Sequence, residues 1–304
     1  MAEPAPLHVL YGSPPLELVD PGAAVQVSPL APGAARLEDL ADGSLEAATL
    51  LAPPGTAERR YALAHALRAL KPGGRLTALA PKDKGGSRLG KELAAFGCQV
   101  NETGKRHHRI CVCERPAEPV GVAEAIAAGA PRFVERLGLW SQPGVFSWDR
   151  PDPGSALLLE RLPALAGRGA DLGAGVGFLA AKILASPKVE ALALIDLDRR
   201  AVELARRNVE DARVTFRQAD VRSGVGLEGL DFVVMNPPFH DGGAEDKALG
   251  QAFIRRAAEA LKTGGQLWLV ANRHLPYEAV LKPLFSRVRL DVETGGFKVY
   301  EARK

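Results

Sequence analysis

The sequence predicts an α/β protein with two tandem Rossmann-like domains, of which the N-terminal one is shortened and degenerate. In the second half of the chain, apolar strand patterns alternate with helix patterns, which is typical of a parallel, doubly wound sheet. A stretch of the first half also recurs at an offset of 191 residues: Ala69–Ala80 matches Ala260–Ala271 as a helix end, a Gly-Gly turn and an apolar strand. Because Thr103-Gly104 falls on Thr294-Gly295 at the same offset, two markers in one register indicate a duplicated domain.

The composition is that of a globular protein: 304 residues, 46% hydrophobic and 25% charged. No basic segment followed by an apolar core begins at Met1, and no run of about 18 apolar residues occurs, so we expect a cytoplasmic protein without membrane association. Cys98, Cys111 and Cys113 form neither an even disulfide set nor a metal-ligand spacing. We therefore expect reduced thiols and no bound metal.

The first copy is predicted to be catalytically empty. Its apolar run at 48–52 ends in Pro53-Pro54, as the run at 230–235 ends in the Pro-Pro pair of Asn236–Phe239, but the asparagine and the phenylalanine are missing. It also has too few residues for a full set of elements and no glycine-rich turn. The stretch Glu114–Pro119, with two prolines in six residues, is the natural linker after this copy. We assign residues 1–117 to the degenerate domain, 118–131 to a linker and 132–304 to the catalytic domain.

Basic residues gather at two places in the first domain. The net charge of +3 is too small to indicate a polyanionic partner by itself. Each cluster fits either a solvated surface or a phosphate-binding one, and the second is denser and includes two histidines. The candidate RNA-binding residues are Lys82, Lys84 and Arg88 in the first cluster, and Lys105, Arg106 and Arg109 in the second.

The second copy is predicted element by element. We expect strands at 168–172, 189–196, 214–218, 230–235 and 266–271, a final strand at 297–302, and helices at 178–185, 199–208 and about 247–261.

A glycine-rich turn follows the first of these strands. Asp171 precedes three alternating glycines, Gly173, Gly175 and Gly177, which let the backbone approach a ligand closely. In a dinucleotide fingerprint the third glycine comes one residue later. The acidic residue would repel a pyrophosphate and suits a ligand that carries an amino group.

Two further aspartates end the next strands. Asp196 is placed to accept both hydroxyls of a ribose, and Asp220 could accept from an exocyclic adenine amine. Each aspartate alone could equally be a helix N-cap. Together with the glycines and the Asn236 motif, they favour a site for S-adenosylmethionine.

Asn236-Pro237-Pro238-Phe239 ends the strand at 230–235. Two prolines fix φ and remove two backbone donors, so the strand stops and Asn236 is held in one orientation. Its side-chain carbonyl can accept from an amine, and Phe239 can lie on a planar ring. The alternative is an ordinary Pro-Pro turn. His240 and Asp241 are candidates for proton acceptors or for helix caps.

These motifs resemble a known family. Asp171–Gly177 and Asn236–Gly242 look like the class I methyltransferases that modify exocyclic or amide nitrogens, while Pro143–Ser155, Ala271–Tyr277 and Gly296–Tyr300 are similar to the RsmC family. The resemblance implies a small-subunit (16S) ribosomal RNA guanine-N2 methyltransferase with one degenerate and one active domain. We expect a monomer, and the resemblance implies ribosomal RNA or the small ribosomal subunit as its partner. The RlmG relatives, which act on large-subunit RNA, share most of these motifs.

The resemblance also implies roles for individual residues. The donor would be bound by Asp171, Gly173, Gly175, Gly177, Asp196, Asp220 and Asn236, with Asp152 and Ser155 near its amino-acid end. The target-base pocket would be formed by Asn236, Pro237, Pro238 and Phe239.

Four other functions remain to be weighed at this point. Asn-Pro-Pro-aromatic motifs also serve protein glutamine and DNA adenine as methyl acceptors. A non-catalytic RNA-binding assembly factor would need both copies to be inactive, and the intact motifs of the second copy argue against it. A nicotinamide oxidoreductase fits least, because the glycine spacing differs.

Overall fold

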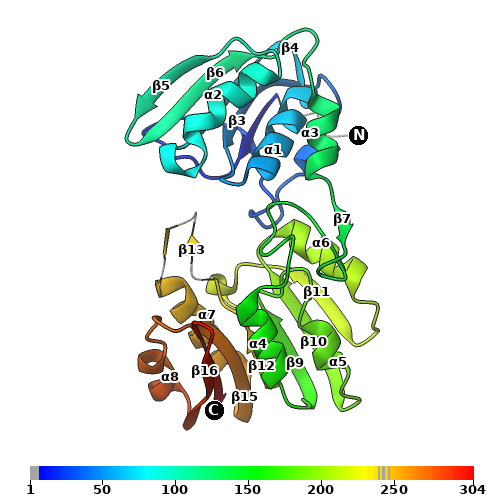
Figure 1. Ribbon diagram of the computed structural model, residues 1–304, viewed down its shortest axis with the longest axis vertical. Coiled ribbons are helices and arrows are strands. Elements are labelled where there is room, and N and C mark those ends of the chain that lie inside the picture. The colour runs from blue at the N-terminus through cyan, green and yellow to red at the C-terminus, as the bar shows by residue number, and fades with distance from the viewer. Residues whose placement is uncertain (1–6, 239, 242–243, 246) are drawn as a thin grey trace. The chain divides into compact units, whose positions relative to one another are not determined.

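The structure is a computed structural model that describes residues 7–238, 240–241, 244–245 and 247–304. The chain divides into two compact units (Figure 1). Unit 1 comprises residues up to 131 together with 142–144, and unit 2 comprises 132–141 and 145–304. No helix within the described ranges is long and apolar enough to cross a membrane.

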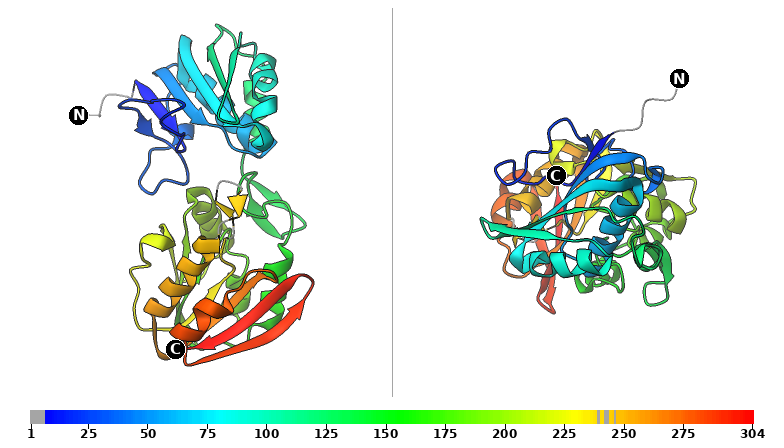
Figure 2. Two further views of the ribbon diagram at one scale, coloured as in Figure 1. Left: turned by 90° about the vertical axis from the view of Figure 1, so that its left-hand side faces the viewer. Right: turned by 90° about the horizontal axis from the view of Figure 1, so that it is seen from above.

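Unit 1 is built on a six-stranded sheet in the order β2-β1-β3-β4-β6-β5. Strands β1 to β4 pair in parallel, and β5 and β6 are antiparallel. Helices α1, α2 and α3 share one core with alternate residues of the strands, so they cover one face of the sheet (Figure 2). The elements are β1 (His8–Tyr11), β2 (Val25–Gln26), β3 (Leu45–Leu51), α1 (Thr56–Ala69), β4 (Leu70–Pro81), α2 (Gly86–Ala95), β5 (Asn101–Lys105), β6 (His108–Glu114) and α3 (Val122–Gly129), with 3-10 turns at Leu37–Asp39 and Lys82–Lys84.

The segment 118–131, which we interpreted as a linker, contains α3 and belongs to unit 1. A Cβ on Gly129 would lie 2.4 Å from the Cβ of Tyr61 in α1, so the two helices approach each other closely. The side chain of Gln142 donates to the carbonyl of Gly129 at 2.9 Å. The proline-rich composition hid a helix that packs on its own domain. The three cysteines of unit 1 are buried and free.

Unit 2 is built on a seven-stranded sheet in the order β11-β10-β9-β12-β15-β17-β16. Strands β9 to β12 and β15 run parallel, and β17 and β16 are antiparallel. Its strands are β9 (Gly167–Leu172), β10 (Val189–Asp196), β11 (Val214–Gln218), β12 (Leu230–Met235), β15 (Leu261–Asn272), β16 (Arg287–Thr294) and β17 (Phe297–Arg303), with two ribbons, β7 (Arg132–Val134) with β8 (Leu139–Ser141) and β13 (His240–Asp241) with β14 (Ala244–Glu245).

Helices cover both faces of the unit 2 sheet. They are α4 (Pro153–Arg161), α5 (Ala180–Leu184), α6 (Arg199–Asn208), α7 (Lys247–Ala260) and α8 (Glu278–Leu284), with a 3-10 turn, η3, at Val221–Ser223. Val233 and Met235 of β12 pack into one core with α7 and α8, and Phe232 and Val234 pack into another with α4 and α5. This alternation follows from the two-residue period of a strand, and it confirms the doubly wound sheet.

Four predicted elements have the bounds expected: β10, α6, β11 and β12. The helix predicted at 178–185 is shorter, because turn conformation continues to residue 179. The strand predicted at 266–271 begins earlier, at Leu261, since it includes the Gly-Gly turn as an irregularity.

The duplication is confirmed in detail. Helix α1 and strand β4 have the same lengths as α7 and β15, and both pairs of bounds differ by the offset of the sequence repeat. Gly73 and Gly264 have φ of 77° and 79°. In both copies the register shifts opposite this turn, between Leu45 and Ala47 and between Leu230 and Phe232. Unit 1 is the shorter copy, since its sheet has one strand fewer and its core takes helices from one side.

Candidate functional site

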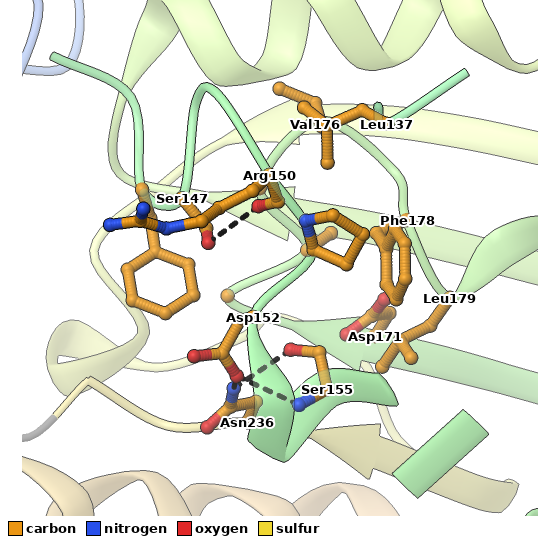
Figure 3. A pocket seen from close by; sticks show the side chains of 15 residues that line it. Leu137, Ser147, Arg150, Asp152, Ser155, Asp171, Val176, Phe178, Leu179 and Asn236 are labelled. Atoms are coloured by element: carbon orange, nitrogen blue, oxygen red, sulfur yellow. Dashed lines mark hydrogen bonds between the residues drawn. The ribbon is translucent and has the colours of Figure 1, made fainter. Parts of the chain in front are cut away.

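A pocket lies at the carboxyl ends of β9 and β12, where an open α/β sheet binds its ligands. Figure 3 shows side chains from four segments that converge on it. They are the β7–β8 ribbon, the loop that leads into α4, the glycine-rich turn, and the turn after β12. The lining residues are Leu137, Phe146, Ser147, Arg150, Pro151, Asp152, Ser155, Asp171, Gly173, Ala174, Gly175, Val176, Phe178, Leu179 and Asn236.

Asp171 is the buried acid of this pocket, with an exposed fraction of 1%. Among the residues that the structure describes, neither of its carboxylate oxygens has a hydrogen-bond partner. Burial and then the nearby charge of Asp196 raise the pKa of Asp171 to about 8. An orphaned buried carboxylate favours a cationic group beside it, so this position fits the ammonium of an amino-acid ligand.

The glycine-rich turn wraps around this acid in left-handed backbone. Gly173, Gly175 and Gly177 have φ of 79°, 54° and 84°, which side chains with a Cβ rarely adopt. A Cβ on Gly175 would meet nothing within 4 Å, so its backbone faces open space. Its N–H donates to Oδ2 of Asp196 at 2.8 Å, which joins the turn to the end of β10.

Asp196 is held by backbone donors at both oxygens, since its Oδ1 accepts from the N–H of Asp198 at 2.8 Å. Burial raises the pKa of Asp196 to about 6, against these hydrogen bonds, which lower it. The carboxylate is fixed and still has lone pairs for hydroxyl donors. It borders the glycine turn but is not among the residues that line the pocket.

Asp220 has a different environment. It is the N-cap residue of the turn at Val221–Ser223 and accepts from the N–H of Arg222 at 2.9 Å. The guanidinium of Arg222 pairs with it at 2.8 Å, and this hydrogen bond lowers the pKa of the Asp220 carboxyl. The structure thus shows the capping role that we considered as the alternative, and Asp220 does not line the pocket.

Asn236 is oriented by two acceptors from α4. Its Nδ2 donates to Oδ2 of Asp152 at 2.9 Å and to Oγ of Ser155 at 2.8 Å. Asp152 is itself fixed as the N-cap of α4, because it accepts from the N–H of Ser155 at 2.7 Å. Both amide hydrogens are therefore engaged, and the carbonyl oxygen of Asn236 is the group left to accept a proton from a ligand.

The rest of the Asn-Pro-Pro motif is described in part. Pro237 is buried and Pro238 is exposed. Phe239 lies outside the described residues. For His240 and Asp241 the backbone is described, as a ribbon pairing with Glu245 and Ala244, but their side chains are not.

Some residues that line or support the pocket escaped the sequence analysis. Phe146 is 59% exposed and lines the pocket with Arg150. Asn208 joins the β7–β8 ribbon to the glycine turn, since its Nδ2 donates to the carbonyls of Trp140 and Val176, both at 2.9 Å. No spacing rule marks these residues. Only the position of Phe146 within the Pro143–Ser155 motif could have indicated it.

The two basic clusters of unit 1 lie together. The N–H of Lys82 donates to the carbonyl of His107 at 2.8 Å, and the Nζ of Lys82 would lie 4.0 Å from a Cβ on Gly104. Arg106 and His107 form the tip of the β5–β6 hairpin with φ of 45° and 59°, as a type I′ turn requires.

Some of these cations already have partners. Arg106 pairs with Glu17 at 2.7 Å and Arg109 with Glu102 at 3.4 Å, while the Nζ of Lys105 donates to the carbonyl of Glu17. Within the described ranges no group of three His, Cys, Asp or Glu side chains could hold a metal ion.

Comparison with known proteins places this site in a family. Residues 136–301 match the model of the methyltransferase small domain. A ribosomal RNA small subunit methyltransferase C of Pseudomonas paraeruginosa is 35% identical over 292 residues, which is 93% of this chain and 87% of that protein. The chain belongs to this methyltransferase family.

Other members and a solved structure agree with this assignment. The Shewanella loihica protein of the same name is 32% identical over 86% of this chain and 78% of its own length. Among solved structures, the Thermus thermophilus 16S rRNA N2 G1207 methyltransferase, in complex with AdoMet and guanosine, matches with a TM-score of 0.77. It is 26% identical and the match covers 100% of this chain and 90% of that one. The family assignment confirms the prediction of an S-adenosylmethionine-dependent methyltransferase built from two Rossmann-like domains.

Proposed function

We propose that this protein transfers the methyl group of S-adenosylmethionine to the exocyclic N2 of a guanine in small-subunit ribosomal RNA. The observation that supports this most strongly is the fixed orientation of Asn236. Its amide hydrogens are taken by Asp152 and Ser155, and its carbonyl oxygen is available to an amine at the carboxyl end of β12. The relatives named for ribosomal RNA methylation, and the guanosine bound by the Thermus enzyme, agree with this acceptor.

The residues of the pocket fit the donor. Asp171 would pair with its ammonium, the backbone at Gly173 to Gly177 would lie along it, and Asp196 would accept from its ribose hydroxyls. When bound, the donor supplies an electrophilic methyl group on a sulfonium. Arg222 bonds both carboxylate oxygens of Asp220, so Asp220 would accept from an adenine amine only with their remaining lone pairs. An unpaired buried carboxylate costs the apoprotein folding free energy. A cationic ligand that pairs with Asp171 explains why the acid is there.

The acceptor nitrogen needs help from the protein. The lone pair of guanine N2 is delocalised into the ring, which makes the nitrogen a poor nucleophile. Hydrogen bonds from N2 to Asn236 Oδ1 and to the carbonyl of Pro237 would hold the amine so that its lone pair points at the methyl carbon. The N–C bond then forms, the C–S bond breaks, and N2 releases one proton. Such positioning is worth several kcal/mol, about 7 at the favourable extreme.

The base must leave its stack to reach this pocket, at a cost of a few kcal/mol. The exposed ring of Phe146, which lines the pocket, offers a surface for stacking. Phe239 is proposed to stack on the target base itself. His240 and Asp241 are proposed as alternative proton acceptors.

We further propose that unit 1 positions the RNA. The basic residues around the β5–β6 hairpin and the start of α2 would contact phosphates, as their proximity suggests. The protein would act in the cytoplasm as a monomer, with ribosomal RNA or the small subunit as its partner.

Replacing Asn236 by alanine tests this function. Asn236→Ala removes the acceptor carbonyl and leaves Asp171 and the glycine turn in place, so we expect methyl transfer to fall by about 100-fold or more, by analogy with the loss of one oriented polar group in other active sites. Donor affinity, measured by isothermal titration calorimetry, should stay within a few-fold of wild type. Transfer is measured with labelled donor on separated small and large subunits, followed by nucleoside analysis.

The outcomes separate the alternatives. N2-methylguanosine in small-subunit RNA supports the proposal. Label in large-subunit RNA, in protein glutamine or in DNA adenine would redirect it, and full activity of Asn236→Ala would contradict the proposed pocket chemistry.

A further inference from the structure

The two copies of the fold differ at one pair of buried positions near the Pro-Pro turn, where a large side chain and a glycine are exchanged. In unit 1 the fourth residue of α1 is Arg59, and its counterpart in α7 at the repeat offset is Gly250. At the same offset Gly86 of unit 1 corresponds to Tyr277 of unit 2. A large polar side chain and a glycine have thus changed places between two structurally equivalent positions.

In unit 1 the large residue is Arg59, which is 1% exposed. Its guanidinium forms a two-pronged ion pair with Glu92, with distances of 2.6 and 2.7 Å. The same guanidinium donates to the carbonyls of Pro53 and Pro54 at 3.0 and 2.7 Å. A Cβ on Gly85, the residue before Gly86, would lie 2.2 Å from its Nη1, so a glycine is needed there.

This contact would keep a methyl acceptor from the Pro-Pro turn of unit 1. Pro53 and Pro54 stand at the same distance from the end of β3 as Pro237 and Pro238 from the end of β12. The guanidinium of Arg59 already donates to these two carbonyl oxygens. A methyl-acceptor amine could bind them only if they were free.

In unit 2 the large residue is Tyr277, which is fully buried. A Cβ on Gly250 would lie 1.7 Å from the hydroxyl of Tyr277 and 2.5 Å from its Cζ. No side chain fits there while the tyrosine stays in place. A glycine inside a helix costs about 0.5–1 kcal/mol of stability. The close approach of the tyrosine hydroxyl explains why a glycine is present at this position.

The face of α7 that carries Gly250 supports the acceptor turn. Phe253 lies one helical turn further along the same face. Its Cε1 would be 3.5 Å from a Cβ on Gly173, and that Cβ would lie 3.8 Å from the backbone carbonyl oxygen of Asn236 and 4.0 Å from Cδ of Pro238. Phe253 and the turn thus approach the same point beside Gly173, and Tyr277, which packs on α7 at Gly250, bears on the helix that carries Phe253. Among the residues that the structure describes, no donor occupies the carbonyls of Pro237 or Pro238.

We propose that Tyr277 is a positioning residue for methyl transfer. It packs against Gly250, the position of α7 that corresponds to Arg59 in α1, and so holds α7 in place while leaving the proline carbonyls to the substrate amine. This inference rests on the proposed function, because it assigns Tyr277 a part in orienting the acceptor.

The test removes the hydroxyl and keeps the ring. For Tyr277→Phe we expect the single-turnover rate of methyl transfer, at saturating donor and RNA, to fall about 10-fold per donor-bound molecule, with the donor Kd unchanged. Gly250→Ala, which forces the ring away, should lower the same rate further. The control is Tyr300→Phe, a second buried tyrosine of the same core, whose hydroxyl donates to Glu278. It should lower the melting temperature and leave the rate per bound molecule unchanged.

Two results would contradict the inference, and they are distinguishable. If wild type transfers methyl groups and Tyr277→Phe does so within two-fold of its rate, Tyr277 has only a packing role, while the proposed function stands. If wild type binds the donor and methylates neither RNA nor guanosine, the proposed function and the inference fail together.

Discussion

Asp171 is the residue at which stability and function conflict most directly. It is buried without a described hydrogen-bond partner, and its pKa rises from an ordinary 3.8 to about 8. A raised carboxyl pKa contributes stability that is fully present below pH 4 and is lost as the pH rises towards 8. Asp171 therefore makes the apoprotein less stable as the pH rises over this range. The ionised form of Asp171, which destabilises the apoprotein, is also the form that binds an ammonium.

Asp171→Asn should accordingly stabilise the apoprotein at pH 8. The gain in unfolding free energy, about 1 kcal/mol or more, should shrink as the pH falls to 5, where wild-type Asp171 is already neutral. Donor affinity should fall sharply at pH 8 and less at pH 5, where the wild-type carboxyl must first lose its proton to pair with the ammonium. Thermal melts at pH 5 and pH 8, combined with calorimetric titration of the donor, measure both effects. If Asp171→Asn were less stable than wild type by the same amount at both pH values, burial would not raise the pKa of Asp171.

At the scale of elements, the α1–β4 and α7–β15 pairs show what one supersecondary unit retains and changes. The bounds, the Gly-Gly turn and the register shift are the same in both copies. The buried side chain near the Pro-Pro turn differs between the two copies. In unit 1 this side chain belongs to a buried ion pair. Breaking a buried ion pair by removing one partner leaves an uncompensated charge, whereas removing both is far less costly.

Arg59→Met should therefore destabilise unit 1 strongly, by about 3–5 kcal/mol. Glu92 would lose its partner, and the carbonyls of Pro53 and Pro54 would lose their donor. The double variant Arg59→Met with Glu92→Leu should recover much of this loss. Urea unfolding, followed by hydrogen exchange to assign the change to unit 1, measures it. Equal destabilisation by the single and double variants would show that the carbonyl contacts matter more than the ion pair.

For the whole molecule, the sequence predicted the features that depend on local pattern. Strand β12 and helix α6 were predicted residue by residue because their apolar periods are long and clear. The duplication was visible because the Gly-Gly turn needs the same backbone in both copies. The partners of Asp152 and Arg59 were not predictable, because they depend on side chains that meet across the fold. Helix α3 was missed for a related reason: prolines flank it and its stability comes from packing on α1.

The basic surface of unit 1 leads to a prediction about the whole molecule, since RNA affinity sums many contacts. Arg106 and Arg109 already pair with Glu17 and Glu102, so a phosphate gains less from them than from cations without such a partner. We expect Lys82→Ala with Arg88→Ala to weaken RNA binding more than Arg106→Ala with Arg109→Ala.

The size and the salt dependence of the effect check this prediction. For single-stranded RNA the slope of log K against log salt should decrease by about 0.7 for each phosphate contact removed. The first pair should lose about 1.4 in slope and the second pair less, with donor affinity unchanged in both. Filter binding between 50 and 200 mM salt measures the slopes. Equal slopes for both pairs and wild type would place the RNA contacts elsewhere on the chain, because cations that contact phosphates must release counterions.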